Sequence, residues 1–170
     1  MNESVLQAET LKKDVTKKDN PGVYIPPPLF YIGAFFISIF IQKKLPLPGF
    51  IAGTAFGNIA GYLCIGLWLC LFLLSMAKFI TSKNTLVTVK PASTLQTTGI
   101  YSLTRNPMYL SLVMLYTGIA MFWGNWYTLF LLPLLILLVQ LYIIRKEEKY
   151  LERAFGEQYK QYRSAVRRWI

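Results

Sequence analysis

The chain alternates long apolar runs with short polar breaks, and this pattern predicts an all-α protein. Four runs, at about residues 25–42, 57–80, 107–123 and 126–144, carry almost no charge. The hydrocarbon core of a bilayer is roughly 30 Å thick, so a helix needs about 20 apolar residues to cross it. We therefore expect a polytopic integral membrane protein with about four transmembrane helices. The third run is short, so it crosses a thinned membrane or forms a buried, partly crossing helix.

The last two runs should form a C-terminal helical hairpin. Gly124 and Asn125 lie between them and are a strong turn signal. Antiparallel helices of equal length return to the same level. The hairpin should therefore bring Asn106 and Pro107, at its start, close to residues 145–148 at its end.

The second run carries glycines at a regular spacing. Gly53, Gly57 and Gly61 recur every four residues, which places them on one helix face where another helix can approach closely. We interpret this face as a packing surface. The alternative is that it also makes room for the hydrocarbon tail of a ligand and admits it sideways from the membrane.

The C-terminal segment has helical periodicity. Its apolar residues recur at positions separated by lysines and arginines, namely Leu151, Phe155, Tyr159, Tyr162 and Val166. This spacing predicts a cytoplasmic amphipathic helix in the membrane interface, with Trp169 anchoring its end.

These elements divide the chain into three parts. Residues 1–24 are polar and charged, with no apolar stretch beside a cleavage site, and are expected to form a flexible cytoplasmic tail. Residues 25–80 should contain two transmembrane helices. Residues 81–170 should contain a loop long enough to fold over a site, the hairpin and the C-terminal helix.

The distribution of charge predicts the topology. Of the 18 lysines and arginines, only Lys43 and Lys44 fall between the first and second runs, and the others lie on the opposite side of a four-span arrangement. The positive-inside rule then places both termini and the loop containing Arg105 in the cytoplasm, for a multi-pass protein of the cell inner membrane. The net charge of +10 is expected to attract anionic headgroups, and no nucleic-acid-binding module is present.

The residue types that are missing narrow the chemistry. The chain has no histidine, which removes imidazole ligands and histidine bases. Cys64 and Cys70 share no metal or redox spacing and are expected to be packing residues. We therefore expect no metal site.

Residues 99–109 are a polar, basic interruption between apolar runs. Each member has a structural explanation: Asn106 as an N-cap, Pro107 at the first helical position, Arg105 in a cytoplasmic loop and Tyr109 in an aromatic belt. The adjacent Glu147 and Glu148 are harder to explain, because two carboxylates at the end of a lipid-embedded helix are costly and face its negative dipole. They require a cation, which neighbouring lysines and arginines or a ligand ammonium or sulfonium could supply.

Together these residues carry a resemblance. The run TGIYSLTRNPMY from Thr98 to Tyr109, an apolar hairpin and then Glu147 and Glu148 followed by LxxxFGxxYxxY from Leu151 closely resemble the isoprenylcysteine carboxyl methyltransferase and phospholipid N-methyltransferase superfamily. The resemblance covers about half of the chain, residues 84–170. It implies an integral membrane methyltransferase that binds S-adenosylmethionine in a cytoplasmic pocket and releases S-adenosylhomocysteine.

The resemblance also implies roles for individual residues. Thr98, Gly99 and Tyr101 match the approach to the first motif, which lines the cofactor; Arg105, Asn106, Pro107 and Tyr109 match the motif itself; Glu147 and Glu148 match the family's Glu-Glu pair. Arg105, Asn106, Tyr109 and Glu148 are the expected catalytic residues. Either glutamate is expected on the cofactor's ammonium or ribose, Asn106 on the cofactor, and Arg105 on the cofactor carboxylate or an anionic headgroup.

The acceptor is expected to be lipid-like or prenylated, methylated on a carboxylate or an amine. The eukaryotic carboxyl methyltransferases have histidine where this chain has Asn106, which weakens the case for a prenylated protein substrate. For an amine acceptor, Glu148, Tyr109 and Tyr101 are the nearby bases. Two alternatives remain open: an NADPH-dependent membrane reductase of the sterol-reductase kind, whose C-terminal histidine and cysteine signature is missing here, and a non-enzymatic membrane scaffold.

Overall fold

A computed structural model describes residues 21–49, 52–81 and 94–170 of the chain, and within these ranges every regular element is helical. In chain order the elements are α2 (Pro27–Lys44), α3 (Ala55–Thr81), the 3-10 helix η1 (Gly99–Ser102), α4 (Pro107–Trp123), α5 (Trp126–Leu138), the π-helical segment η2 (Val139–Ile144) and α6 (Arg145–Ala165). The prediction of an all-α protein is confirmed for this part of the chain.

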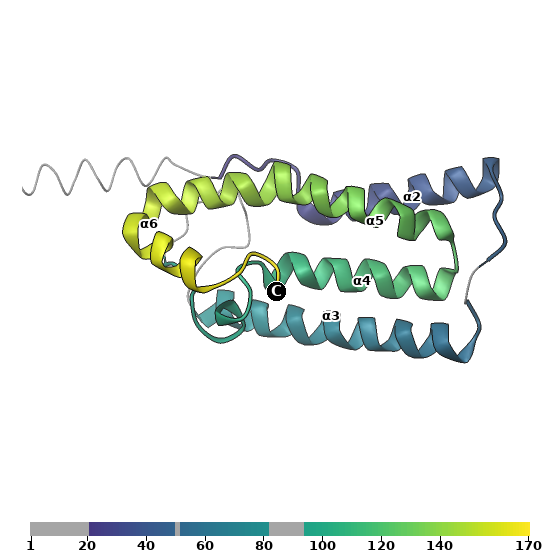
Figure 1. Cartoon of the computed structure of the whole chain (residues 1–170), viewed down its shortest axis with the longest axis horizontal. Helices are drawn as coiled ribbons and strands as arrows, with labels where there is room; N and C mark the ends of the chain where they lie inside the picture. Colours follow the sequence, from purple (N-terminus) through teal and green to yellow (C-terminus); the bar gives the residue numbers. More distant parts are fainter. Residues whose placement is uncertain (1–20, 50–51, 82–93) are drawn as a thin grey trace, which may run out of the picture.

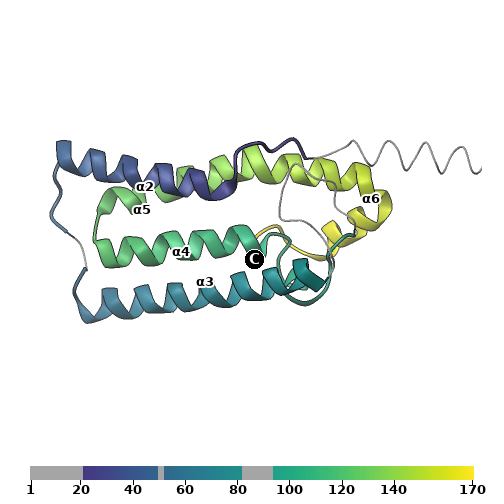
Figure 2. The same cartoon turned by 180° about the vertical axis from the view of Figure 1, so that it is seen from behind.

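The helices α2, α3, α4 and α5 run side by side along the long axis of the molecule, with α4 between α3 and the pair α2 and α5 (Figures 1 and 2). The predicted hairpin is present. Gly124 closes α4 in the left-handed conformation, with φ 68°, which glycine adopts without steric cost. Asn125 then caps α5, because its side chain accepts a hydrogen bond from the backbone N–H of Tyr127 at 2.9 Å.

Small residues allow α3 and α4 to pack closely. A Cβ atom on Gly61 would lie 2.7 Å from the Phe122 ring, and one on Gly118 would lie 2.9 Å from Cδ1 of Ile65. The packing role predicted for the glycine face therefore holds at Gly61. Gly53, however, precedes α3 and has φ 77°, so it is a turn residue and not a member of that face.

The helix that begins at Trp126 does not end at residue 144, where its apolar run ends. α5 passes through η2 into α6 without a break, so Glu147 and Glu148 follow the apolar run inside a continuous helix and do not face a free C-terminal dipole. The sequence-based interpretation, that the negative end of a helix dipole destabilises these two carboxylates, is therefore wrong. The chain instead bends at Gly156, where φ is 50° and ψ −124°, and α6 folds back toward the bundle (Figure 1).

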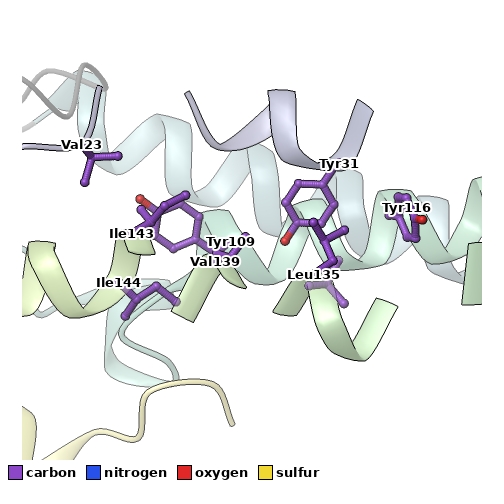
Figure 3. Packing of buried hydrophobic residues seen from close by; sticks show 9 residues of the cluster. Val23, Tyr31, Tyr109, Tyr116, Leu135, Val139, Ile143 and Ile144 are labelled. Carbon is purple, nitrogen blue, oxygen red and sulfur yellow. The ribbon is translucent and has the colours of Figure 1, made fainter. Parts of the chain in front are cut away.

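The core lies between α2, α4 and η2, near the end of the bundle where α4 begins. Figure 3 shows Tyr31, Tyr109 and Ile143 among the side chains of this cluster. A π-helical segment is a local widening of the helix that is often found at functional sites. Here it carries Val139, Ile143 and Ile144, each fully buried.

Two helices are long and apolar enough to cross a membrane: Ala55–Thr81 and the continuous helix Trp126–Ala165, while Pro107–Trp123 is shorter. Large apolar side chains on α2 and α3 face outward, including Phe36 and Leu63, each 64% exposed. Contiguous apolar surface of this kind suits lipid contact. The count of four spans stays a prediction.

The remaining predictions concern Trp169, the two ends of the chain and the loop after residue 81. Trp169 packs against the core cluster and its Nε1 donates to Gln140 Oε1 at 2.9 Å, and its role as an interface anchor stays a prediction. The predicted tail at residues 1–24 falls largely, and the predicted loop after residue 81 mostly, outside the described residues. The placement of α6 in the membrane interface and the three-part division of the chain stay predictions.

The close packing of α3 on α4 leads to a stability prediction. Gly61→Leu should lower the free energy of unfolding in detergent by about 1–3 kcal/mol, because the side chain must displace the Phe122 ring. Gly66→Leu, on the same helix with nothing within 4 Å of an added Cβ, is the matched control and should be neutral or slightly stabilising. Equal effects of the two changes in thermal unfolding would contradict the predicted packing.

Candidate functional site

A cavity of about 340 Å³ lies at the end of the bundle where α4 and α6 begin. The predicted site residues that line it are Tyr101, Arg105, Asn106, Pro107, Tyr109, Glu147 and Glu148. The hairpin therefore brings the two motifs together, as its equal arms predict. Thr98 and Gly99 do not line the cavity: Thr98 Oγ1 accepts a hydrogen bond from Lys78 at 3.1 Å, and the stem of the same lysine covers Gly99.

Asn106 precedes α4 but does not cap it. Its side chain makes no hydrogen bond to the first turn of the helix; instead Nδ2 donates to the backbone oxygen of Arg168 at 2.9 Å. Asn106 thus occupies the predicted N-cap position without making the side-chain cap, and Pro107 occupies the first helical position as predicted. A buried amide directed at the C-terminal segment orders the turn that carries Arg105.

Glu148 is held by two arginines. Arg168 donates to both of its carboxylate oxygens, at 2.9 and 2.7 Å, and Arg105 Nη1 lies 3.2 Å from Oε1. The side chains of Arg105 and Glu148 are only 10% and 13% exposed. Charge-assisted bonds of this bidentate kind are short and directional, so they fix the Glu148 carboxylate in place.

Arg105 retains unused hydrogen-bonding capacity. Its Nη1 also donates to the Tyr159 hydroxyl at 3.2 Å, but its buried Nε has no partner among the described residues. An unpaired buried donor costs free energy. Because Arg105 lines the cavity, an anionic ligand group could complete its hydrogen bonds.

Glu147 has a different environment from its neighbour. It is partly buried, lines the cavity and accepts a hydrogen bond from the Tyr109 hydroxyl at 2.5 Å. It lies in α6, beyond the apolar run that ends at Ile144. The pKa of the Glu147 carboxyl is raised to about 7, chiefly by desolvation; the Tyr109 hydrogen bond lowers this pKa and the charge of the adjacent Glu148 raises it.

Aromatic side chains form much of the cavity wall. Tyr101 packs edge-on against Phe79, and the Tyr162 hydroxyl donates to the Tyr101 backbone oxygen at 2.7 Å. Tyr150 and Tyr159 also line the cavity. Aromatic faces attract cations, including quaternary and sulfonium centres, so this wall suits a positively charged ligand.

The C-terminal segment is a part of the site that the sequence analysis missed. The backbone oxygen of Arg167 accepts from the Arg105 N–H at 3.0 Å, and that of Arg168 accepts from Thr104 Oγ1 at 3.2 Å and from Asn106. The C-terminus accordingly lies beside the start of α4 in both views (Figures 1 and 2). No spacing signal reveals Arg168, because the bend at Gly156 brings it to Glu148 from 20 residues away.

A second, apolar groove of about 310 Å³ lies between α2 and α4. It is lined by residues such as Phe35, Leu115 and Ile119, and it shares Pro28 and Leu112 with the first cavity. The groove therefore adjoins the cavity at these two residues. The glycine face of α3 cannot provide a path for a ligand tail at Gly61, because the Phe122 ring occupies the space.

Comparison with known proteins gives the family. A family model described as phospholipid methyltransferase matches residues 56–158, which includes α3, the hairpin and most of α6. The chain belongs to the phospholipid methyltransferase family. The match places it within the superfamily that its motifs resemble, and the family is one of methyltransferases. A protein of Haemophilus influenzae described as "Uncharacterized protein" is 36% identical over 63 residues, 37% of this chain and 100% of its own length. No solved structure matches.

The described residues contain no group of three or more His, Cys, Asp or Glu side chains that could hold a metal ion. The polar side chains that line the cavity include those of Arg105, Asn106, Glu147, Glu148 and several tyrosines.

The ion pairs of Glu148 lead to a second prediction. Arg168→Ala should lower the free energy of unfolding in detergent by about 2 kcal/mol, since it removes two charge-assisted hydrogen bonds from a largely buried carboxylate. Arg163→Ala, which removes the exposed 3.0 Å pair with Glu152, should cost about 0.5 kcal/mol or less. Thermal unfolding followed by circular dichroism measures both, and a loss for Arg163→Ala as large as that for Arg168→Ala would contradict the prediction.

Proposed function

We propose that the protein is an integral membrane methyltransferase that uses S-adenosylmethionine to methylate a lipid-like acceptor. The observation that carries this proposal is the meeting of Arg105, Asn106 and Pro107 with Glu147 and Glu148 around one cavity. These are the two motifs by which the chain resembles its superfamily. The volume of about 340 Å³ is within the range of small-molecule sites.

The cofactor's amino-acid end suits the pair Arg105 and Glu148. The unpaired Nε of Arg105 offers a donor for a carboxylate. A carboxylate has about four acceptor positions, and the hydrogen bonds and ion pair of Glu148 use three of them. One position remains for an ammonium, and the tyrosine wall suits the sulfonium.

The acceptor's hydrocarbon tail is proposed to lie in the groove between α2 and α4, with its headgroup in the cavity. The shared lining residues Pro28 and Leu112 support this arrangement. A water-soluble cofactor would enter from the polar end and the lipid from the side, so the two reactants would meet where the groove joins the cavity.

The chemistry places modest demands on the protein. S-adenosylmethionine supplies a methyl group that its sulfonium already activates for in-line displacement. The protein contributes positioning, which must bring the nucleophile to about 3 to 3.5 Å from the methyl carbon. Asn106 and the arginines fix the loop and α6 relative to each other, and the buried tyrosines exclude water from the reacting groups.

The topology proposed for this enzyme follows from charge. Both termini and the cavity would lie on the cytoplasmic side of the inner membrane, and the protein would be multi-pass, because most of its lysines and arginines flank that end of the spans.

Calorimetric binding of S-adenosylhomocysteine to the detergent-purified protein tests the cofactor. We expect micromolar binding by the wild type and a loss of about tenfold or more for Glu148→Gln and Asn106→Ala, because each removes or misplaces a charged contact. Arg105→Lys should weaken binding as well, since a single ammonium cannot reproduce a bidentate contact. Glu157→Gln, whose side chain is 77% exposed on the outer surface of α6, is the matched control. No binding by a folded wild type would overturn the proposal.

Narrowing the groove between α2 and α4 tests the acceptor's position. Leu115→Trp should reduce methylation of a total lipid extract by about tenfold, because it removes space for the tail, while S-adenosylhomocysteine binding stays unchanged. Leu63→Trp, at an outward-facing position of α3, is the control and should leave both unchanged. Full lipid methylation by Leu115→Trp would contradict the groove assignment.

A further inference from the structure

We propose that residues 21–26, the irregular segment before α2, form a gate beside the cavity, and that the buried side chain of Val23 is the latch that holds this gate closed. The segment is called the strap below. The inference rests on the proposed function, because the ligand whose exchange the strap controls is S-adenosylhomocysteine. The opening of the strap itself can be measured without a ligand.

The first argument is the position of the strap. It runs beside the junction of η2 and α6 before the chain enters α2 (Figures 1 and 2). Pro21, at its start, lines the cavity, and so do Pro27 and Pro28, where α2 begins. Between them Val23 is 1% exposed and belongs to the core cluster that contains Ile143 (Figure 3). The strap is therefore a wall of the cavity that is fastened to the core through Val23.

A second attachment joins the strap to α6. Lys146 Nζ donates to the backbone oxygen of Gly22 at 3.4 Å, and the same ammonium lies 4.0 Å from the centroid of the Tyr142 ring. The hydrogen bond is long, because typical N–H···O distances are about 2.7–3.2 Å, and the contact with Tyr142 does not involve the strap. Lys146 therefore adds a weaker support to the closed position than the burial of Val23 does.

The strap can open while α2 and α6 stay folded. Its backbone is irregular, and the side chains of Tyr24 and Ile25 are 77% and 43% exposed, so its opening removes little of their contact with the protein. Pro26, with φ −58°, precedes two further prolines that fix the backbone at the start of α2. The hinge therefore lies at residues 24 and 25. Segments that bury few apolar side chains open at a lower free energy than the core.

The size of the cavity gives a reason for opening. Its volume of about 340 Å³ is at the low end of the range of about 300–1,000 Å³ for sites that hold one drug-sized ligand, whereas the proposed reaction needs a cofactor and an acceptor headgroup side by side. Most of the wall belongs to packed helices or, as at Arg105 and Glu148, is held by ion pairs. Residues 94–96 are the other irregular part of the wall, and none of them is fully buried.

Cysteine labelling of the full chain in detergent measures the opening directly. Cys64 and Cys70 are first replaced by alanine, and single cysteines are then introduced by Val23→Cys, Tyr24→Cys and Ile144→Cys. A maleimide should label the exposed position 24 fastest. Position 23 should react about 10²-fold more slowly, because it is accessible only in the open state. Position 144, equally buried but within η2, should react at least about tenfold more slowly still.

The attachment to α6 provides a second variant for the same measurement. Lys146→Met keeps the apolar stem but removes the ammonium that donates to Gly22, so it should raise the labelling rate of Val23→Cys by about threefold. Lys149→Met removes the same charge from an exposed position of α6 and should leave the labelling rate unchanged.

The exchange of S-adenosylhomocysteine tests the gate. Val23→Ala removes two buried methyl groups from the closed state and should raise the open fraction about tenfold. If the ligand enters and leaves through the open state, the association and dissociation rates both rise about tenfold while Kd stays within about threefold of the wild type. Val139→Ala removes the same two groups from an equally buried residue of the cluster outside the strap and should leave both rates unchanged.

Three results would overturn the inference. The first is labelling of Val23→Cys as slow as that of Ile144→Cys, since the strap would then open only when the core unfolds. The second is a Val23→Ala variant in which neither rate changes, or in which only dissociation accelerates and affinity falls in parallel. The third is Leu95→Ala raising both rates while Val23→Ala does not, which would place the gate at residues 94–96. If the wild type binds no S-adenosylhomocysteine, the proposed function fails, and the labelling rates alone then decide whether the strap opens.

Discussion

The arrangement of the site depends on one carboxylate, that of Glu148, shared between Arg105 and Arg168. Its bonds join three parts of the chain that are distant in sequence: the turn before α4, the first turn of α6 and the C-terminal segment. A largely buried carboxylate without a cation would be strongly destabilising, so the folded state requires both the bend at Gly156 and the return of the C-terminus. The backbone bonds of Arg167 and Arg168 to the turn are made in the same conformation.

The two adjacent glutamates show how neighbouring residues on a helix acquire different properties. Successive helical side chains point about 100° apart, so Glu148 meets the arginines while Glu147 meets Tyr109. The Glu148 carboxylate forms ion pairs with two arginines, whereas the Glu147 carboxyl is desolvated beside a neutral donor, and desolvation raises its pKa to about 7.

The apolar bundle confines this chemistry to one end of the molecule. Polar groups within the hydrocarbon region must find partners inside the protein, and the long outward-facing apolar surfaces of α2 and α3 leave no place for ionised groups along their length. The charged residues of the site therefore gather where the helices reach water. The apolar groove between α2 and α4 shares Pro28 and Leu112 with the cavity at this boundary, which supports the placement proposed for an acceptor with a polar head and an apolar tail.

Sequence alone determined the helices and the meeting of the motifs. The apolar run of residues 107–123 matches α4, and Gly124 and Asn125 make the turn that returns residues 145–148 to Asn106 and Pro107, because helix period and hairpin geometry are local properties. What only the tertiary structure decided were contacts made across the fold: the pairing of Arg168 with Glu148, the use of the Asn106 amide by the C-terminal segment and the hydrogen bond of Trp169 to Gln140. A bend at a single glycine sets these contacts, and residue spacing does not encode which distant side chains such a bend brings together.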